Sequence, residues 1–255
     1  MKMRIEPFKS IDVYLIPKLI ELGMDKNIFP LTIFSSDGYE AYLREQLKLS
    51  EEYRRIKLYA AFIDDQFAGY SEWRILENCL FLNNIYVSQR YQGLGIGKFL
   101  LETHGAELLA EHKKSIISLD VFDNNTKAIS WYKKMGFFIE DTTCWYVSEQ
   151  SFLRDTNSCN DCFIENYPNA QAEHKLFGFS MLTCTTKNGN YPIGRINNQF
   201  YRLSIPKSLE DNELLSCLYQ LDPNRKLLIL ATGEISSEFP LKLVCRSNRM
   251  NLIIK

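Results

Sequence analysis

The sequence lacks long apolar runs and any excess of charge of one sign, and both absences exclude classes of protein. No window approaches the roughly 20 consecutive apolar residues that a transmembrane helix requires, so we expect no membrane partner. The chain begins Met1-Lys2-Met3-Arg4 without an apolar core, so we expect no signal peptide. Its 30 basic and 31 acidic side chains leave a formal net charge of −1, which argues against a nucleic-acid partner.

The seven cysteines follow no pattern typical of a zinc site or of a disulfide framework. A zinc site commonly needs two Cys-x-x-Cys pairs, whereas this chain has one such spacing, from Cys159 to Cys162. Cys184, Cys217 and Cys245 are single and distant. A redox motif would need a strand before the pair and a helix after it, but the preceding residues are polar and turn-like. We therefore expect no metal, and we interpret the cysteines as reduced thiols of a cytoplasmic protein.

Hydrophobic periodicity predicts alternating strands and helices over the first 150 residues. The expected strands cover residues 3–8, 53–63, 66–76, 80–87, 115–122 and 138–147. The expected helices cover residues 12–23, 36–49, 99–112 and 126–135. The fifth strand would join the fourth in parallel, because a helix crosses between them. The pattern therefore predicts an α/β fold with a mixed, mostly antiparallel sheet and helices on both faces.

A glycine-dense turn separates the expected strand 80–87 from the helix that follows it. Gly93, Gly95 and Gly97 alternate along this turn, and the absence of Cβ atoms lets backbone N–H groups converge on one point. The positive end of the helix dipole lies beside that point. These features predict an anion site for a phosphate or diphosphate. The residues alone also permit a glycine-rich turn without a ligand.

The spacing of the turn excludes two phosphate-binding loops and fits a third. A dinucleotide fingerprint would need glycine in place of Lys98, and a P-loop would need glycine in place of Gln92. The pattern that fits is Gln-x-x-Gly-x-Gly, carried by Gln92, Gly95 and Gly97. It resembles the acyl-CoA diphosphate loop of the GNAT N-acetyltransferase superfamily. In that family an apolar pair flanks a variable residue at the end of the preceding strand, as in residues 85–87 here.

A second motif lies downstream at the distance that the same family shows. The family pattern is Asn-x-x-Ala, then an aromatic pair that ends in Tyr, then Gly-Phe. This chain supplies, in that order, Asn125, Ala128, Trp131, Tyr132, Gly136 and Phe137. An ordinary amphipathic helix with a glycine C-cap would explain these residues singly. Two motifs in order and correctly spaced favour the resemblance, which covers about residues 4–146.

The resemblance implies a GNAT-like fold in which two central strands splay apart, with acetyl-CoA as cosubstrate. The splayed strand would grip the pantetheine arm and the acyl carbonyl, and the loop amides would bind the diphosphate. Asn125 would order the helix entry and hydrogen-bond the CoA arm, and Tyr132 would give its proton to the CoA sulfur. The implied cofactor-binding residues are Ile85, Tyr86, Val87, Gln92, Gly93, Leu94, Gly95, Ile96, Gly97, Lys98, Asn125, Ala128, Trp131 and Tyr132.

The general base departs from the pattern of the family. Many relatives carry Glu on the strand before the loop, where this chain has Asn83 and Asn84. Glu72, on the preceding expected strand, is our catalytic candidate for this role, acting directly or through water. Glu77 is an alternative, although a solvated charge at a strand end explains it as well. His104, on the expected crossover helix, fits a packing role better than a catalytic one.

From about residue 150 the composition changes and we recognise no motif. Residues 151–172 are polar and rich in asparagine, which indicates a linker or a crossing loop. The expected elements beyond it are strands 175–186 and 193–204, helix 209–221, and strands 226–232 and 241–254. We therefore expect a GNAT-like domain at 1–150, this linker, and a small α+β domain of unknown role at 173–255. A domain of about 80 residues is marginal alone, which favours docking on the first domain or a homodimer.

The expected function is transfer of an acetyl group from acetyl-CoA to a primary amine, through direct attack in a ternary complex. The acceptor would be a small-molecule or peptide amine. The alternative is an acyl-CoA-binding regulatory or scaffold protein with weak or no transferase activity. The missing strand carboxylate favours the alternative, whereas Tyr132 favours the enzyme because a phenol with an ordinary pKa of about 10 is protonated at neutral pH.

Overall fold

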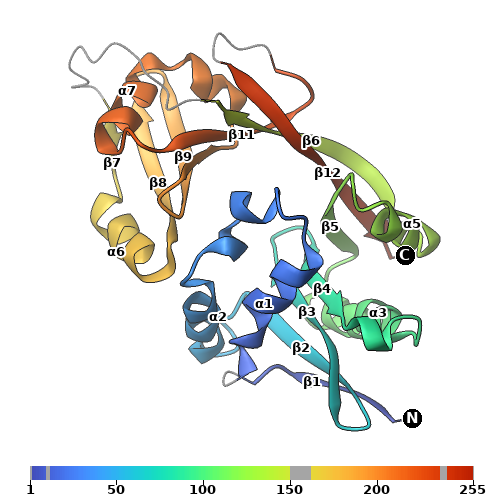
Figure 1. Ribbon diagram of the computed structural model, residues 1–255. Coiled ribbons are helices and arrows are strands. Elements are labelled where there is room, and N and C mark those ends of the chain that lie inside the picture. The colour runs from blue at the N-terminus through green and yellow to red at the C-terminus, as the bar shows by residue number, and fades with distance from the viewer. Residues whose placement is uncertain (1, 10–11, 150–161, 236–239, 255) are drawn as a thin grey trace. The chain divides into compact units, whose positions relative to one another are not determined.

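The computed structural model describes residues 2–9, 12–149, 162–235 and 240–254. The chain forms two compact units, and each unit takes residues from more than one part of the sequence (Figure 1). The first unit contains Met1–Gly23, Tyr42–Asp141 and Asn248–Lys255, and the second contains Met24–Ala41 and Thr142–Ser247. This division differs from the sequential one expected, because residues 24–41 belong to the second unit and residues 248–255 to the first.

The sheet of the first unit follows the predicted pattern closely. Its strands are β1 (Met3–Pro7), β2 (Ile56–Ile63), β3 (Gln66–Ile75), β4 (Leu80–Val87) and β5 (Ile116–Phe122), with the end of β12 (Leu241–Ile253) and the start of β6 (Phe138–Ser148), in the spatial order β1-β2-β3-β4-β5-β12-β6. β1 to β4 are antiparallel neighbours, and β5 is parallel to β4. The β2–β3 turn places Asp64 and Asp65 at φ 46° and 66°, as a tight hairpin turn requires.

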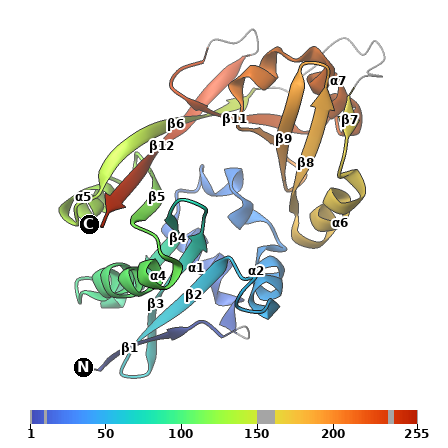
Figure 2. The same cartoon turned by 180° about the vertical axis from the view of Figure 1, so that it is seen from behind.

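Helices cover the sheet of the first unit, as Figure 2 shows from behind. They are α1 (Leu15–Gly23), α2 (Tyr39–Lys48), α3 (Ile96–Lys98), a π-helical turn (Phe99–His104), α4 (Gly105–His112) and α5 (Thr126–Lys134). The segment from α3 to α4 is one continuous helix, because Lys98, Phe99, His104 and Gly105 all have right-handed helical backbones. Its apolar side packs on Trp73, Leu80 and Leu82 of the sheet. No helix in the described part of the chain is long and apolar enough to cross a membrane.

The second unit has elements that the sequence prediction partly misplaced. They are 3₁₀ turns at Phe29–Leu31 and Ile33–Ser35, β7 (Phe163–Ile164), α6 (Tyr167–Phe177), β8 (Phe179–Thr186), β9 (Gly189–Ile196), β10 (Phe200–Leu203), a 3₁₀ turn (Pro206–Glu210), α7 (Asn212–Leu221) and β11 (Lys226–Thr232). Its strand order is β12-β6-β11-β10-β9-β8-β7. Residues 150–161 of the expected linker lie outside the described residues, and Cys159 is among them.

The predictions for the linker and for one strand of this unit are wrong. The expected linker 151–172 contains the start of α6, which begins with a proline in its first turn and ends at Gly178 with φ 75°. Proline at a helix start and left-handed glycine after its end are ordinary helix boundaries. The expected strand 193–204 is two strands, β9 and β10, because Asn197 adopts φ 48° and turns the chain back between them.

The second unit repeats the topology of the first. In the first unit β1, α1, α2, β2, β3 and β4 are followed by a helical crossover to the parallel strand β5. In the second, β7, α6, β8, β9 and β10 are followed by α7 and the parallel strand β11. The pairs β7–β8, β8–β9 and β9–β10 are antiparallel, as are their counterparts. The expected β-β-α-β-β order is therefore replaced by a second copy of the same arrangement.

Candidate active site

The central strands of the first unit splay apart, as the sequence resemblance implies. β4 pairs with β5 from Leu80–Leu82 to Ile117–Leu119, and neither strand pairs with the other beyond that point within the described residues. The rest of β4, including Ile85, Tyr86 and Val87, remains paired with β3. Its backbone groups on the β5 side are consequently available to a ligand.

A β-bulge lies where the splay begins. Glu72 of β3 faces Asn84 and Trp73 faces Leu82, so Asn83 is the extra residue of β4. The Asn83 amide donates to the Glu72 carboxylate over 2.6 Å, and the Arg74 guanidinium lies 3.4 Å from the same oxygen. Glu72 is fully buried. The candidate base is thus a carboxylate on β3, paired across the sheet with Asn84 of β4.

Tyrosines line the same face of the sheet as Glu72. Tyr70 and Tyr86 are paired residues of β3 and β4, and their rings stack at 6.5 Å between centroids. The Tyr70 hydroxyl donates to Asn84 over 3.0 Å. Burial raises the pKa of Tyr70, with the charge of Glu72 as the next cause. Tyr70 is therefore a neutral hydrogen-bond donor near the carboxylate.

The glycine loop presents unused amides at a helix start. Gly93 and Gly95 have φ 81° and 82°, a conformation that favours glycine, and their missing Cβ atoms would have pointed into open space. Among the described residues, the amides of Gly93, Leu94 and Gly95 donate no hydrogen bond to the protein. The first helical bond runs from the Phe99 amide to the Gly95 carbonyl over 2.9 Å, which leaves the α3 amides free as well. This is the chemistry of an anion site.

Side chains fix the loop to the strand before it. Ile96 is 1% exposed and packs in a core cluster, so the helix start is anchored. The Gln92 amide donates to the Val87 carbonyl over 3.2 Å, and the Lys98 ammonium lies 3.7 Å from Glu102. Both polar side chains expected near the diphosphate thus have protein partners. Leu94 is exposed at the tip of the loop.

The second motif meets the loop through the residues of α5. Asn125 is the N-cap of this helix, because its side-chain oxygen accepts from the Ala128 amide over 3.1 Å. A Cβ placed on Gly97 would lie 3.3 Å from the Trp131 indole, so the indole covers the last glycine of the loop. The structure brings the two motifs of the sequence into direct contact.

Tyr132 is a core residue as well as the candidate acid. It is 6% exposed, and its ring lies 4.9 Å from Trp131 and 5.5 Å from Phe137 between centroids. Burial raises the pKa of Tyr132, so the phenol is protonated at neutral pH. No hydrogen bond joins its hydroxyl to another residue that the structure describes. A protonated phenol without a partner can donate to a ligand.

One charged residue near the loop was not predicted. The Lys127 ammonium, at the start of α5, donates to the Gln92 side-chain oxygen over 3.1 Å. The sequence offered one signal, which is that Lys127 lies two residues after the motif asparagine. This spacing does not reveal a contact with Gln92, which is 35 residues away in the chain. By contrast, the contacts of His104 are with residues outside the loop. Its Nδ1 atom is hydrogen-bonded to Glu107 over 2.6 Å, and its ring packs on Tyr59. No group of three or more His, Cys, Asp or Glu among the described residues could hold a metal ion.

In the second unit, a carboxylate occupies the place that corresponds to the glycine loop of the first. The connection from β10 to α7 contains no glycine but has Asp211 as the helix N-cap. One Asp211 oxygen accepts from the amides of Glu213 and Leu214, both over 3.1 Å, and the other accepts from the Thr186 hydroxyl over 2.6 Å. Asp211 is 3% exposed. The helix-start amides that are free in the first unit are therefore used internally in the second.

Comparison with known proteins decides the family. The sequence profile of the acetyltransferase (GNAT) family matches residues 29–137. A spermidine N(1)-acetyltransferase from Thermoplasma acidophilum is 34% identical over 121 residues, which are 43% of this chain and 73% of that protein. The chain belongs to the GNAT acetyltransferase family. This confirms the resemblance on which the site prediction rests.

Other GNAT relatives match over different extents. A spermine/spermidine N(1)-acetyltransferase from Bacillus subtilis is 36% identical over 58 residues, 23% of this chain, and the chain spans only 38% of its length. A GCN5-related N-acetyltransferase from Sphaerobacter thermophilus has a TM-score of 0.63 at 12% identity, covering 99% of this chain and 96% of that one. A tandem GNAT protein from the clavulanic acid biosynthesis pathway has a TM-score of 0.61 at 10% identity, covering 99% and 98%. The fold of both units therefore has GNAT precedents.

Proposed function

We propose that this GNAT family member transfers an acetyl group from acetyl-CoA to a primary amine in a ternary complex on its first unit. The observation that carries the proposal is the set of unused amides at Gly93, Leu94 and Gly95, next to a splayed strand and a buried, protonated Tyr132. These N–H groups are suited to bind a diphosphate, because they donate no hydrogen bond within the described protein and lie at a helix start. We also propose a cytoplasmic location, which suits the scattered cysteines.

In this proposal each residue meets one requirement of amide formation. The loop amides hold the diphosphate, and the Val87 N–H polarises the thioester carbonyl. Glu72 takes a proton from the attacking amine, directly or through water. As the new C–N bond forms, the C–S bond breaks, and Tyr132 donates its proton to the departing sulfur. The products are the N-acetylated amine and CoA. Solvent then takes the proton from Glu72 and returns one to Tyr132.

The acceptor class comes from the relatives rather than from the site. Two of them carry names that specify spermidine or spermine N-acetylation. We therefore propose a polyamine as the first acceptor to test, with a peptide N-terminus and free lysine as alternatives. Release of CoA should be measured with each amine at a fixed acetyl-CoA concentration. Absence of CoA release with every amine would contradict an N-acetyltransferase.

A second function keeps support from one observation. The bulge of β4 carries Asn83 rather than a carboxylate, and Glu72 is already bonded to Asn83 and Arg74. Both features suit an acyl-CoA-binding regulatory or scaffold protein. Tyr132→Phe separates the two functions, because it should retain CoA affinity and lose turnover only in an enzyme. Glu72→Gln should also lower turnover if Glu72 is the base, and wild-type turnover in this variant would remove it from the mechanism.

A further inference from the structure

A lysine stands at the helix end where a positive charge is least favourable. Lys127 is the second residue of α5 after the Asn125 N-cap, and the first turn contains no acidic residue. The N-terminal end of a helix carries a partial positive charge, so a cation there is destabilised. Lys133 and Lys134, at the C-terminal end of α5, are placed where the dipole stabilises them. Lys127 is the exception on this helix.

The unfavourable placement has no compensating partner within the described residues. No carboxylate there forms an ion pair with Lys127. Its ammonium donates instead to the neutral side-chain oxygen of Gln92 over 3.1 Å. Gln92 precedes Gly93, the first of the residues whose amides are unused. The cation is thus tethered at the edge of the anion site without being neutralised.

The geometry of α5 directs Lys127 toward the loop. Residues four apart lie on one helix face, so Lys127 and Trp131 share a face. Trp131 covers Gly97 at one end of the loop, and Lys127 contacts Gln92 at the other. This face therefore spans the glycine loop and adds one positive charge to its backbone amides.

We infer that Lys127 is a binding residue for a phosphate group of coenzyme A, an assignment that rests on the proposed function. A phosphate oxygen is a stronger acceptor than the Gln92 amide oxygen, because both partners are then charged. Bound phosphate would also remove the unfavourable interaction between Lys127 and the helix dipole. The phosphate is either part of the diphosphate or the ribose 3′-phosphate, since both carry the same chemistry.

The test is calorimetric titration of the full chain and three variants with coenzyme A and with 3′-dephospho-coenzyme A. We expect Lys127→Gln to weaken coenzyme A binding about fivefold, the effect of one partly exposed charge contact. The deficit should shrink at high salt, because salt screens exposed charges. Lys127→Arg should restore binding, and Lys134→Gln, which changes an exposed lysine at the other end of α5, should leave it unchanged. Circular dichroism verifies that each variant is folded.

Each outcome has a distinct meaning. If the Lys127→Gln deficit disappears with the 3′-dephospho compound, the contact is to the 3′-phosphate, and if it persists, the contact is to the diphosphate. Both support the inference. Equal coenzyme A affinity of Lys127→Gln and the wild-type chain would overturn it while leaving the proposed function intact. A wild-type chain that binds no coenzyme A would overturn the proposed function, and the inference with it.

Discussion

The indole of Trp131 lies against Gly97 so closely that a Cβ at residue 97 would come within 3.3 Å of its ring. Gly97 differs in this respect from Gly93 and Gly95, whose positive φ angles explain them and whose Cβ positions face open space. Gly97 is inside α3, where the backbone alone would accept any side chain. Its role is to let the second motif approach the first.

Gly97→Ala tests this packing. Alanine favours the helix over glycine by up to about 1 kcal/mol, but its Cβ would press on Trp131 and lie 3.7 Å from Val87. We expect the midpoint of thermal unfolding to change little, because the two effects oppose each other. Coenzyme A affinity, measured by calorimetry, should fall several-fold as the loop and α5 separate. In the double variant Gly97→Ala/Trp131→Phe the smaller ring should restore part of that affinity. An unchanged affinity in Gly97→Ala would show that the contact has no role in binding.

Tyr132 predicts a particular shape for the pH–rate profile. A general acid works while it is protonated, so its contribution ends as pH rises through its pKa. Because burial raises the pKa of Tyr132, turnover should not decline on its account up to about pH 10, the ordinary pKa of a phenol. At neutral pH, Tyr132→Phe should lower turnover about 10²-fold or more, with coenzyme affinity retained. The prediction is wrong if wild-type turnover declines near pH 8 and this decline is absent from Tyr132→Phe, because the Tyr132 phenol would then lose its proton well below pH 10.

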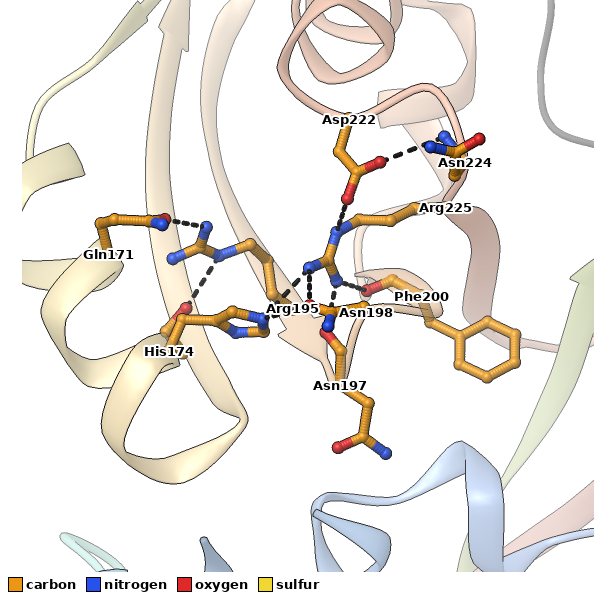
Figure 3. Close-up of polar contacts among 10 residues, drawn as sticks. Gln171, His174, Arg195, Asn197, Asn198, Phe200, Asp222, Asn224 and Arg225 are labelled. Atoms are coloured by element: carbon orange, nitrogen blue, oxygen red, sulfur yellow. Dashed lines mark hydrogen bonds and ion pairs between the residues drawn. The ribbon is translucent and has the colours of Figure 1, made fainter. Parts of the chain in front are cut away.

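The second unit contains a polar cluster around two buried arginines, Arg195 and Arg225 (Figure 3). The Arg225 guanidinium lies 3.1 Å from the Nε2 atom of His174. A guanidinium only donates, so Nε2 accepts and the imidazole is neutral. Burial lowers the pKa of His174, and the charges of Arg195 and Arg225 lower it further. Arg195 donates to Ser180 and to the Ala170 carbonyl and is itself buried.

His174 therefore destabilises the fold in acid. Its unfolded pKa is about 6.5, and its folded pKa is lower, so the unfolded chain binds the proton more readily. The contribution of neutral His174 is complete above about pH 6.5 and is lost as pH falls toward the folded pKa. Urea unfolding at pH 7.5 and 5.5 should show a lower midpoint at the acid pH.

The control is His174→Gln, which keeps a hydrogen-bond acceptor for Arg225 but does not titrate. Its urea midpoint should fall less between the two pH values than that of the wild-type chain. Asn198 should remain available to Arg225 in both proteins, because its side-chain oxygen also accepts from this guanidinium. An equal fall in the two proteins would assign the pH dependence to other groups.

The first unit was largely predictable because its signals are local. The expected strand 80–87 matches β4 residue for residue, since an apolar, β-branched run ends there at a glycine turn. The helix after the loop begins at Ile96 rather than Phe99, because the left-handed Gly95 ends the turn earlier than the apolar period suggests. The N-cap role of Asn125 is confirmed by its bond to Ala128.

The sequence did not reveal one local helix start, nor the features that depend on contacts between distant residues. Pro168 and the asparagines around it look like a loop, yet the proline occupies the first turn of α6. The repeat of topology leaves no trace in the motifs, since Asp211 stands where the first unit has glycines. The position of Glu72 at the bulge depends on strand register, and the Lys127–Gln92 contact joins residues 35 apart.

The last prediction concerns the number of coenzyme sites per chain. In the second unit, Asp211 uses both oxygens to bind the α7 amides and Thr186, so that helix start has no free amide pair for a phosphate. Calorimetric titration should therefore give one coenzyme A per chain. Asp211→Ala removes an N-cap and a buried hydrogen-bond network, and should lower the free energy of unfolding by about 1–3 kcal/mol. It should leave coenzyme affinity and stoichiometry unchanged, because the binding amides belong to the first unit. Asp211→Asn, which retains one acceptor oxygen, should be less destabilised. Two coenzymes bound per wild-type chain would show that the carboxylate does not close the second site.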